Sequence, residues 1–157
     1  MTIYTIGYEG LAVDDFVGLL RAWEIDTVVD VRELPLSRKK GFSKTSLCER
    51  LSQDGLGYEH MANLGCPRSV RYRYRADGDW SRYTMEFLAH LRTQTAAVMA
   101  LAERASAERC ALLCFEADAA FCHRSMVADA VHEVCGARVA HIPVKAMPVA
   151  GRQLAFA

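Results

Sequence analysis

The sequence lacks any long apolar run. No window reaches the roughly 18 consecutive apolar residues that a membrane-spanning helix needs, although 52% of all residues are hydrophobic. The first residues, MTIYTIG, also lack the basic segment and cleavage site that begin a secretory signal peptide. We therefore expect a cytoplasmic protein with no membrane segment.

The sequence also lacks the composition of a disordered or fibrous chain. It has 4 prolines and 10 glycines in 157 residues, and 24% of its residues are charged, as in ordinary globular proteins. We see no internal repeat, linker or low-complexity stretch. A chain of this length can bury one core without disulfides or metal, so we expect a single domain over residues 1–157.

Cysteine is not scarce, but nothing in the sequence indicates secretion. In a short secreted chain, six cysteines would indicate a disulfide framework, whereas without a signal peptide we expect reduced thiols. Several of them stand in apolar surroundings and are expected in the core. The six are Cys48, Cys66, Cys110, Cys114, Cys122 and Cys135.

The sequence also lacks a formal net charge, since its 19 basic residues balance its 19 acidic residues. The charge is nevertheless uneven, because ten basic and four acidic residues lie between Arg32 and Arg75. We expect this part of the molecule to attract anions.

Short apolar runs alternate with helical patterns along most of the chain. The β-branched and apolar runs predict strands at residues 2–6, 27–31, 58–61, 110–115 and 139–142. Helical spacing predicts a helix capped by Asp14, another that begins after Ser43, a long one over residues 80–103 with a break near 93–95, and one over 122–134. Residues 63–78 are expected to form a long surface loop, and Pro143 and Pro148 an extended tail.

This alternation predicts an α/β fold. We expect one mostly parallel sheet of about four to five strands with helices on both faces, a Rossmann-like three-layer sandwich. Ligands of such sheets bind beyond the carboxyl ends of the strands. The side chains at these ends are therefore the candidates for function.

The stretch ALLCFEADAAFCHRS, residues 111–125, carries the densest group of such candidates. Its apolar strand leads to Glu116, and a loop then delivers Cys122, His123 and Arg124 to the first turn of a helix. The free N–H groups and dipole of a helix N-terminus favour an anion and lower the pKa of a thiol. Cys122 is therefore a candidate nucleophile, although a buried, inert cysteine is an equal alternative.

Two other strand ends complete the expected site. Tyr8 follows the first strand, and Asp30 and Arg32 lie at the end of the second. We assign catalytic roles to Asp30, Glu116, Cys122 and His123. We assign ligand binding to Tyr8, Arg32, Ser37, Arg38 and Arg124.

Metal binding is an alternative use of this region. Cys114, Glu116, Cys122 and His123 are possible ligands, but their spacing differs from the C-x(2–4)-C and H-x(3–5)-H pairs of compact zinc sites. We therefore assign no metal ligand from the sequence. Another alternative is a purely structural polar network that stabilises the sheet.

The segment RSVRYRYR, residues 68–75, alternates arginine with Tyr72 and Tyr74. Such a segment can contact phosphates while its rings stack on bases. An exposed, solvated segment shows the same alternation, and a pI near 6.9 is low for a nucleic-acid-binding domain. We regard a solvated surface as the better interpretation and nucleic-acid binding as the less favoured one.

The combination of motifs resembles the domain of unknown function 488 family, in order and over nearly the whole chain. The matching elements are Thr5-Ile6-Gly7-Tyr8, Asp30-Val31-Arg32 with Pro35, Ser37 and Arg38, then Phe42, Tyr58, Leu64-Gly65, Cys114-Phe115-Glu116, Cys122-His123-Arg124 and His141-Ile142. The resemblance implies an α/β sandwich and no established activity. This chain departs from the family pattern at Tyr8-Glu9, where His and Ser are common, and at Cys66, where a second glycine is common.

The leading functional hypothesis is a small enzyme, or an enzyme-like domain, that binds an anionic nucleotide or phosphorylated ligand at the carboxyl edge of the sheet. A nucleic-acid or protein-binding module that uses residues 68–75 and a metal-binding protein are the alternatives. The cofactor is left open, and the helix from Trp80 onward could cover the sheet or form a homodimer.

Overall fold

A five-stranded parallel sheet forms the centre of the molecule in this computed structural model, which describes residues 1–144. The strands are β1 (Thr2–Gly7), β2 (Thr27–Asp30), β3 (Gly57–His60), β4 (Cys110–Cys114) and β5 (Arg138–His141). Their spatial order is β3-β2-β4-β1-β5, and each neighbouring pair is parallel. The predicted α/β fold with four to five parallel strands is confirmed.

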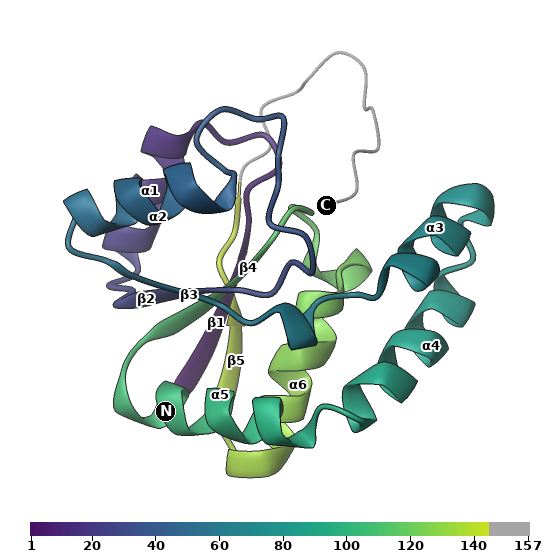
Figure 1. The fold of residues 1–157 in the computed structure, drawn as a ribbon. Coiled ribbons are helices and arrows are strands. Elements are labelled where there is room, and N and C mark those ends of the chain that lie inside the picture. The colour runs from purple at the N-terminus through teal and green to yellow at the C-terminus, as the bar shows by residue number, and fades with distance from the viewer. Residues whose placement is uncertain (145–157) are drawn as a thin grey trace.

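Helices cover both faces of the sheet (Figure 1). The connections β1–β2 and β2–β3 run toward one edge, and the later connections run back toward the other. Since parallel crossovers are right-handed, the two directions place their helices on opposite faces. The helices are α1 (Val13–Ala22) and α2 (Lys44–Gln53) on one face, and α5 (Thr95–Ala107) and α6 (His123–Cys135) on the other, while α3 (Arg68–Asp77) and α4 (Trp80–Arg92) project beyond the sheet.

The two faces of the strands supply two apolar cores. In β4, Ala111 and Leu113 pack in the core with α1 and α2, whereas Cys110 and Leu112 pack in the core with α3 to α6. Because strand side chains alternate between faces, Cys114 points to the same side as Cys110. The alternation therefore directs Cys114 toward α6.

The order of the remaining elements is close to the predicted one. The long helical region is divided where expected, with α4 ending at Arg92 and α5 beginning at Thr95. Gly136 ends α6 in a left-handed conformation, with φ at 73°. Asp14 was wrongly predicted as a helix cap, because the helix begins one residue earlier and Ala12 occupies the cap position.

The predicted loop over residues 63–78 is wrong. Helix α3 occupies residues 68–77 of this segment, and the short 3-10 helix η1 (Ala62–Leu64) precedes it. A second short 3-10 helix, η2 (Ala119–Phe121), lies in the loop after β4. Val70 and Tyr74 lie four residues apart on its inner face and pack against the core. The alternation of Arg and Tyr concealed this helical spacing, because most other positions of the segment are polar and exposed.

No helix within residues 1–144 is long and apolar enough to cross a membrane. The expected extended tail includes Pro148, which lies outside the described residues 1–144.

Candidate functional site

The carboxyl ends of β1, β2 and β4 meet at one edge of the sheet, as predicted. The ladder between β1 and β4 continues past both strands, since Tyr8 N–H donates to Cys114 O at 3.2 Å and Glu9 N–H to Phe115 O at 2.8 Å. Gly7 permits this approach, because a Cβ atom there would lie 1.8 Å from Glu116 O. A glycine is therefore needed at this point to place the loop that carries Glu116.

The first group of polar side chains at this edge is the Asp30–Arg32 cluster, formed by Asp30, Arg32, Tyr8 and Tyr58. Arg32 donates from Nε to Asp30 Oδ1 at 2.9 Å and from Nη2 to Oδ2 at 2.7 Å, a bidentate ion pair with both side chains fully buried. Tyr58 adds a hydrogen bond to Asp30 Oδ2 at 2.5 Å. The predicted acid and the predicted anion-binding arginine are thus bound to each other.

Tyr8 completes this cluster from β1. Its hydroxyl accepts a hydrogen bond from Arg32 Nη1 at 3.3 Å, and its ring stacks on Phe42 with centroids 4.5 Å apart. Burial raises the pKa of Tyr8, although Ser37 and Arg32 oppose the shift. The hydroxyl is therefore a neutral hydrogen-bonding group at ordinary pH.

The second group is the thiol–histidine cluster, formed by Cys114, Cys122 and His123. Cys114 ends β4, Cys122 is the residue before α6, and His123 is the first residue of that helix. Each sulfur lies near His123 Nδ1, at 3.7 Å for Cys114 and 4.0 Å for Cys122, and all three residues are at most 3% exposed. Sequence analysis assigned Cys122 and His123 to the site and named Cys114 only as a possible metal ligand, and the structure brings Cys114 from β4 next to both.

The backbone determines which nitrogen of His123 faces the sulfurs as an acceptor. His123 Nε2 lies 2.6 Å from the carbonyl oxygen of Val31. A carbonyl oxygen only accepts hydrogen bonds, so Nε2 carries the proton. In the neutral ring, Nδ1 therefore presents its lone pair to the two thiols.

The two thiols differ in acidity. Burial opposes ionisation of Cys122, but a hydrogen bond with Cys114, contact with the protonated ring of His123 and the charge of Arg124 outweigh it, so the pKa of Cys122 lies well below its usual value. The pKa of Cys114 is raised, because this thiol donates to Cys122 and is itself buried. Cys122 is therefore the more readily ionised sulfur of the pair, and its role as a nucleophile stays a prediction.

Arg124 is buried and stabilises the loop after β4. It donates from Nη1 to Glu116 O at 2.5 Å, from Nη2 to Ala117 O at 3.3 Å and from Nε to the Thr5 hydroxyl at 3.2 Å. The guanidinium thus makes the hydrogen bonds that water would otherwise make to these backbone carbonyls. These bonds hold the loop that carries Glu116 in place.

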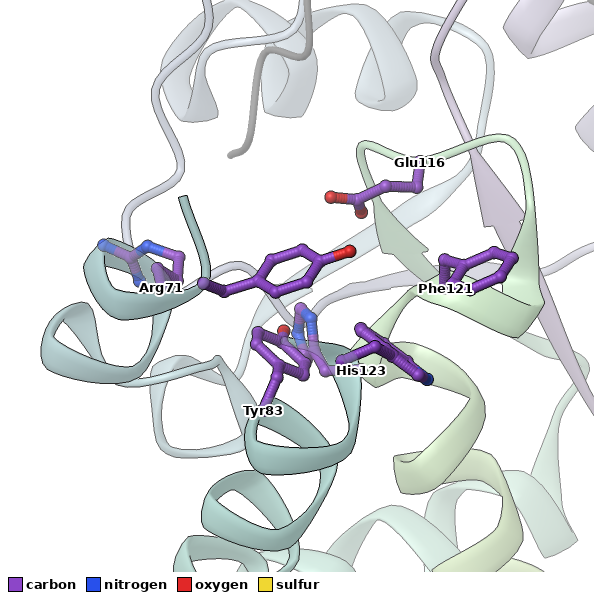
Figure 2. Close-up of a pocket in the computed structure, with 7 residues that line it drawn as sticks. Arg71, Tyr83, Glu116, Phe121 and His123 are labelled. Atoms are coloured by element: carbon purple, nitrogen blue, oxygen red, sulfur yellow. The ribbon is translucent and has the colours of Figure 1, made fainter. Parts of the chain in front are cut away.

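A pocket adjoins the thiol–histidine cluster, with His123 common to both (Figure 2). The space accessible to the centre of a water molecule is about 10 Å³, which is room for about one water. Its walls come from α3, α4, the loop after β4 and α6. The lining residues are Arg71, Tyr74, Trp80, Tyr83, Glu116, Phe121 and His123.

Glu116 is the acidic group of this pocket. Its carboxylate reaches in from the loop after β4, across from Tyr83 and His123 (Figure 2). The Oε2 atom is shielded from solvent and has no hydrogen-bond partner. Burial and the neighbouring Cys122 raise the pKa of Glu116 well above its usual value, against the opposing effect of Arg124. An unpartnered buried oxygen is costly and is rare in purely structural networks.

Several predicted site residues do not line this pocket. Asp30, Arg32 and Tyr8 belong to the neighbouring cluster. Ser37 accepts a hydrogen bond from Lys39 N–H at 3.1 Å, and Arg38 is exposed. Their assigned roles in ligand binding or catalysis stay predictions.

Arg71, Trp80 and Tyr83 are pocket residues that sequence analysis did not assign to the site. The α3–α4 hairpin brings them there, and Trp80 and Tyr83 stack with centroids 4.7 Å apart. Trp80 and Tyr83 fall in the helix expected over residues 80–103 and Arg71 in the expected loop, and no local signal connected either segment to the end of β4. Cys66, the departure from the family pattern, is buried outside the lining, and burial raises its pKa to about 12.

Two arginines of segment 68–75 form ion pairs within the protein. Arg71 pairs with Glu33 at 3.1 Å and Arg73 with Glu86 at 2.6 Å. Tyr72 is half exposed, with the guanidinium of Arg68 4.9 Å from its ring centroid. Nucleic-acid binding by this helix stays a prediction.

Comparison with known proteins gives a family and no further relative. The family model described as domain of unknown function DUF488 matches residues 12–131. No curated protein and no solved structure gives a match. The matched region contains the predicted motifs from Asp30 to Arg124, so the resemblance stated from the sequence is confirmed. This chain belongs to the DUF488 family.

Proposed function

We propose that this chain is a small enzyme whose reaction site is the pocket around Glu116, and that its substrate is a small anionic molecule. Glu116 is the acid or base of this site, and Arg71 supplies the positive charge for the ligand. The observation that carries the proposal is the shielded, unpartnered Oε2 of Glu116 in a pocket that Arg71 and His123 also line.

The position of Arg71 supports anion binding better than the arginines named from the sequence. Arg32 is fully engaged with Asp30, and Arg124 with backbone carbonyls. Arg71 lies at the pocket wall, where its Nη1 contacts Glu33 at 3.1 Å and the carbonyl oxygen of Cys66. A ligand phosphate or carboxylate would replace Glu33 as its partner.

The size of the pocket requires α3 to move when a ligand enters. The space in the present structure suits about one water. Val70 is the one buried residue of helix α3, and Tyr74 is partly buried against the core, so few apolar contacts oppose displacement of the helix. Entry of a nucleotide-sized molecule is therefore coupled to opening of the α3–α4 hairpin.

The reducing cytoplasm is the compartment that suits this site. All six cysteines are free thiols, and an oxidising environment would convert neighbouring thiols to disulfides.

A thermal-shift screen tests the proposal. The full chain, kept in reductant and chelator, is screened against nucleotides, phosphorylated metabolites and short carboxylic acids, because any ligand of the folded state raises its apparent stability. Each hit is titrated with wild type, Glu116→Gln and Arg71→Met. We expect Arg71→Met to weaken binding at least about tenfold, as removal of a charged contact does, whereas Glu116→Gln keeps the shape of the carboxyl group and should abolish turnover of a hit while it leaves the affinity for an anion close to wild type.

Arg73→Met is the matched control, because Arg73 lies on the same helix and forms an exposed ion pair outside the pocket. It should bind the hits as wild type does. Equal affinity in all four proteins would show that the ligand binds elsewhere and that the proposal is wrong. Shifts with oligonucleotides alone, lost in salt and in Arg73→Met, would also contradict it and would favour nucleic-acid binding by α3.

A further inference from the structure

The thiol–histidine cluster joins three potential metal ligands from separate elements. Cys114 Sγ, Cys122 Sγ and His123 Nδ1 all lie within 4.8 Å of one another, and the three residues are buried. Nine positions separate Cys114 from His123 in the sequence. The spacing of the motif therefore differs from compact zinc motifs, while the fold brings the donor atoms together.

The distances between the donors resemble those around a tetrahedral ion. Bonds of about 2.3 Å to sulfur and about 2.1 Å to nitrogen place the two donors about 3.6 Å apart at the tetrahedral angle. The structure has 3.7 Å from Cys114 Sγ to Nδ1 and 4.0 Å from Cys122 Sγ to Nδ1. The two sulfurs lie within 4.8 Å of each other, against about 3.8 Å on one tetrahedral ion, so the cysteine side chains would move closer together by up to about 1 Å when an ion binds.

His123 is already oriented as a ligand. Its Nε2–H group donates to Val31 O at 2.6 Å, which leaves the Nδ1 lone pair directed at the two sulfurs. Metal-binding histidines usually donate their other ring N–H to a carbonyl or carboxylate in this way. This hydrogen bond fixes the ring at the end of β2 without any contribution from an ion.

The chemistry of the donors selects the class of ion. Two thiolates neutralise the charge of a divalent ion in this buried position, where an unbalanced charge would be costly. Thiolate and imidazole donors favour zinc and similar transition metals over magnesium or calcium. Three protein ligands are also the number found in catalytic zinc sites, which keep a fourth position open.

We propose that Cys114, Cys122 and His123 bind a divalent transition metal ion, zinc in preference to the hard cations, with the fourth position open toward the pocket. His123 belongs to both the cluster and the pocket lining, which puts this position next to the space that holds about one water. Both sulfurs bind as thiolates, so the proton of Cys114, and that of Cys122 where it is still present, passes to solvent as two metal–sulfur bonds and one metal–nitrogen bond form. This goes beyond the proposed function, which assigns no metal.

Titration of the reduced, metal-free full chain with Co²⁺ tests the site directly. Cobalt takes the same tetrahedral geometry as zinc and gives thiolate-to-cobalt absorption in the near ultraviolet. We expect saturation at one Co²⁺ per chain, displacement by Zn²⁺ and no displacement by Mg²⁺. Cys114→Ser and Cys122→Ser should each weaken the affinity at least about tenfold, with reduced thiolate absorption.

Cys110→Ser is the matched control, because Cys110 is equally buried at the opposite end of β4. It should bind Co²⁺ as wild type does. Circular dichroism of each variant establishes that it is folded, and the wild-type titration stands even if one variant is not. Absence of thiolate absorption in the folded wild type, or an equal effect of all three substitutions, would overturn the proposal.

The outcomes of the two proposals are separable. The ligand screen is run in chelator and depends on Arg71, whereas the cobalt titration is run without a substrate and depends on Cys114 and Cys122. Failure of the cobalt titration therefore leaves the pocket proposal intact. Failure of the ligand screen leaves the metal site intact.

Discussion

Two clusters of polar side chains lie at the same edge of the sheet, on neighbouring strands, and they differ in how completely they are satisfied. In the Asp30–Arg32 cluster, opposite charges form a bidentate pair at 2.7 and 2.9 Å, and two tyrosines add hydrogen bonds. In the thiol–histidine cluster, the contacts between donors are longer and weaker, and the adjoining Glu116 keeps an oxygen without a partner.

This difference separates a stabilising network from a candidate reaction site. A buried ion pair with all its hydrogen bonds formed has little capacity left for a ligand. Buried groups that lack partners are retained against a free-energy cost, which is typical of binding and catalytic sites. The number of charged residues at the edge does not distinguish the two clusters, whereas their remaining bonding capacity does.

The largest expected effect on stability comes from a substitution in the Asp30–Arg32 cluster. Asp30→Asn leaves the Arg32 charge buried without a counter-ion, and we expect the free energy of unfolding to fall by about 3–5 kcal/mol. Urea denaturation followed by circular dichroism measures the change. Asp77→Asn, which alters an exposed ion pair with Arg82, serves as the control and should have little effect.

A double variant sharpens this test. Asp30→Leu with Arg32→Met removes both charges, and we expect it to be more stable than Asp30→Asn alone. If Asp30→Asn were as stable as wild type, Asp30 and Arg32 would not form the stabilising network described here.

A smaller loss is expected where the loop after β4 meets β1. Gly7→Ala would put a Cβ atom 1.8 Å from Glu116 O, so the backbone must shift, with a cost of about 1–3 kcal/mol or more. The matched control is Gly18→Ala on the exposed face of α1, where no atom lies within 4 Å of the added carbon. That variant should gain about 0.5–1 kcal/mol. Equal stability of the two variants would contradict the close approach.

Glu116→Gln is expected to change stability by less than about 1 kcal/mol, in either direction. The substitution removes a carboxylate whose Oε2 has no partner, so no ion pair is broken. Thermal and urea unfolding measure it beside Asp30→Asn. A loss as large as that of Asp30→Asn would show that Glu116 belongs to a stabilising network, and the contrast between the two clusters would fail.

The smallest expected effect is the contribution of His141 to the pH dependence of folding stability. Burial, assisted by the charge of Arg124, lowers the pKa of His141 below its usual 6.5, although Asp129 and Cys122 oppose the shift. As pH falls through 6.5, the unfolded chain binds the proton first, so the folded state loses stability until the lower folded pKa is passed. Urea unfolding at about pH 7.5 and about pH 5.5 should show a smaller loss in His141→Gln than in wild type. An equal loss in both would exclude this contribution.

Much of the fold could be predicted because its signals are local. Continuous apolar runs indicated the buried strands, and helical spacing indicated the helices over residues 80–103, with the break between α4 and α5, and over residues 122–134. The alternation of strands and helices then predicted the parallel sheet. Helix α3 was missed because its inner residues, Val70 and Tyr74, stand among arginines that obscure their spacing.

The candidate site could be predicted only in part. Glu116, Cys122 and His123 were identified since a strand end followed by a helix N-terminus is recognisable in a sequence. Arg71 and Tyr83 were not connected to them, because that contact depends on how the α3–α4 hairpin turns toward the end of β4. Whether Arg32 and Arg124 were available to an anion depended on partners from β1, β2 and β4.

The sequence by itself determined the α/β class, the family, the edge of the sheet where polar groups gather, and three members of the candidate site. These follow from periodicity and order along the chain, which local physics controls. Only the tertiary structure decided which polar groups satisfy one another, that Cys114 joins Cys122 and His123, and that Glu116 retains an unpartnered oxygen. Those properties depend on distances between atoms of different elements, which are set when the two apolar cores pack against the sheet.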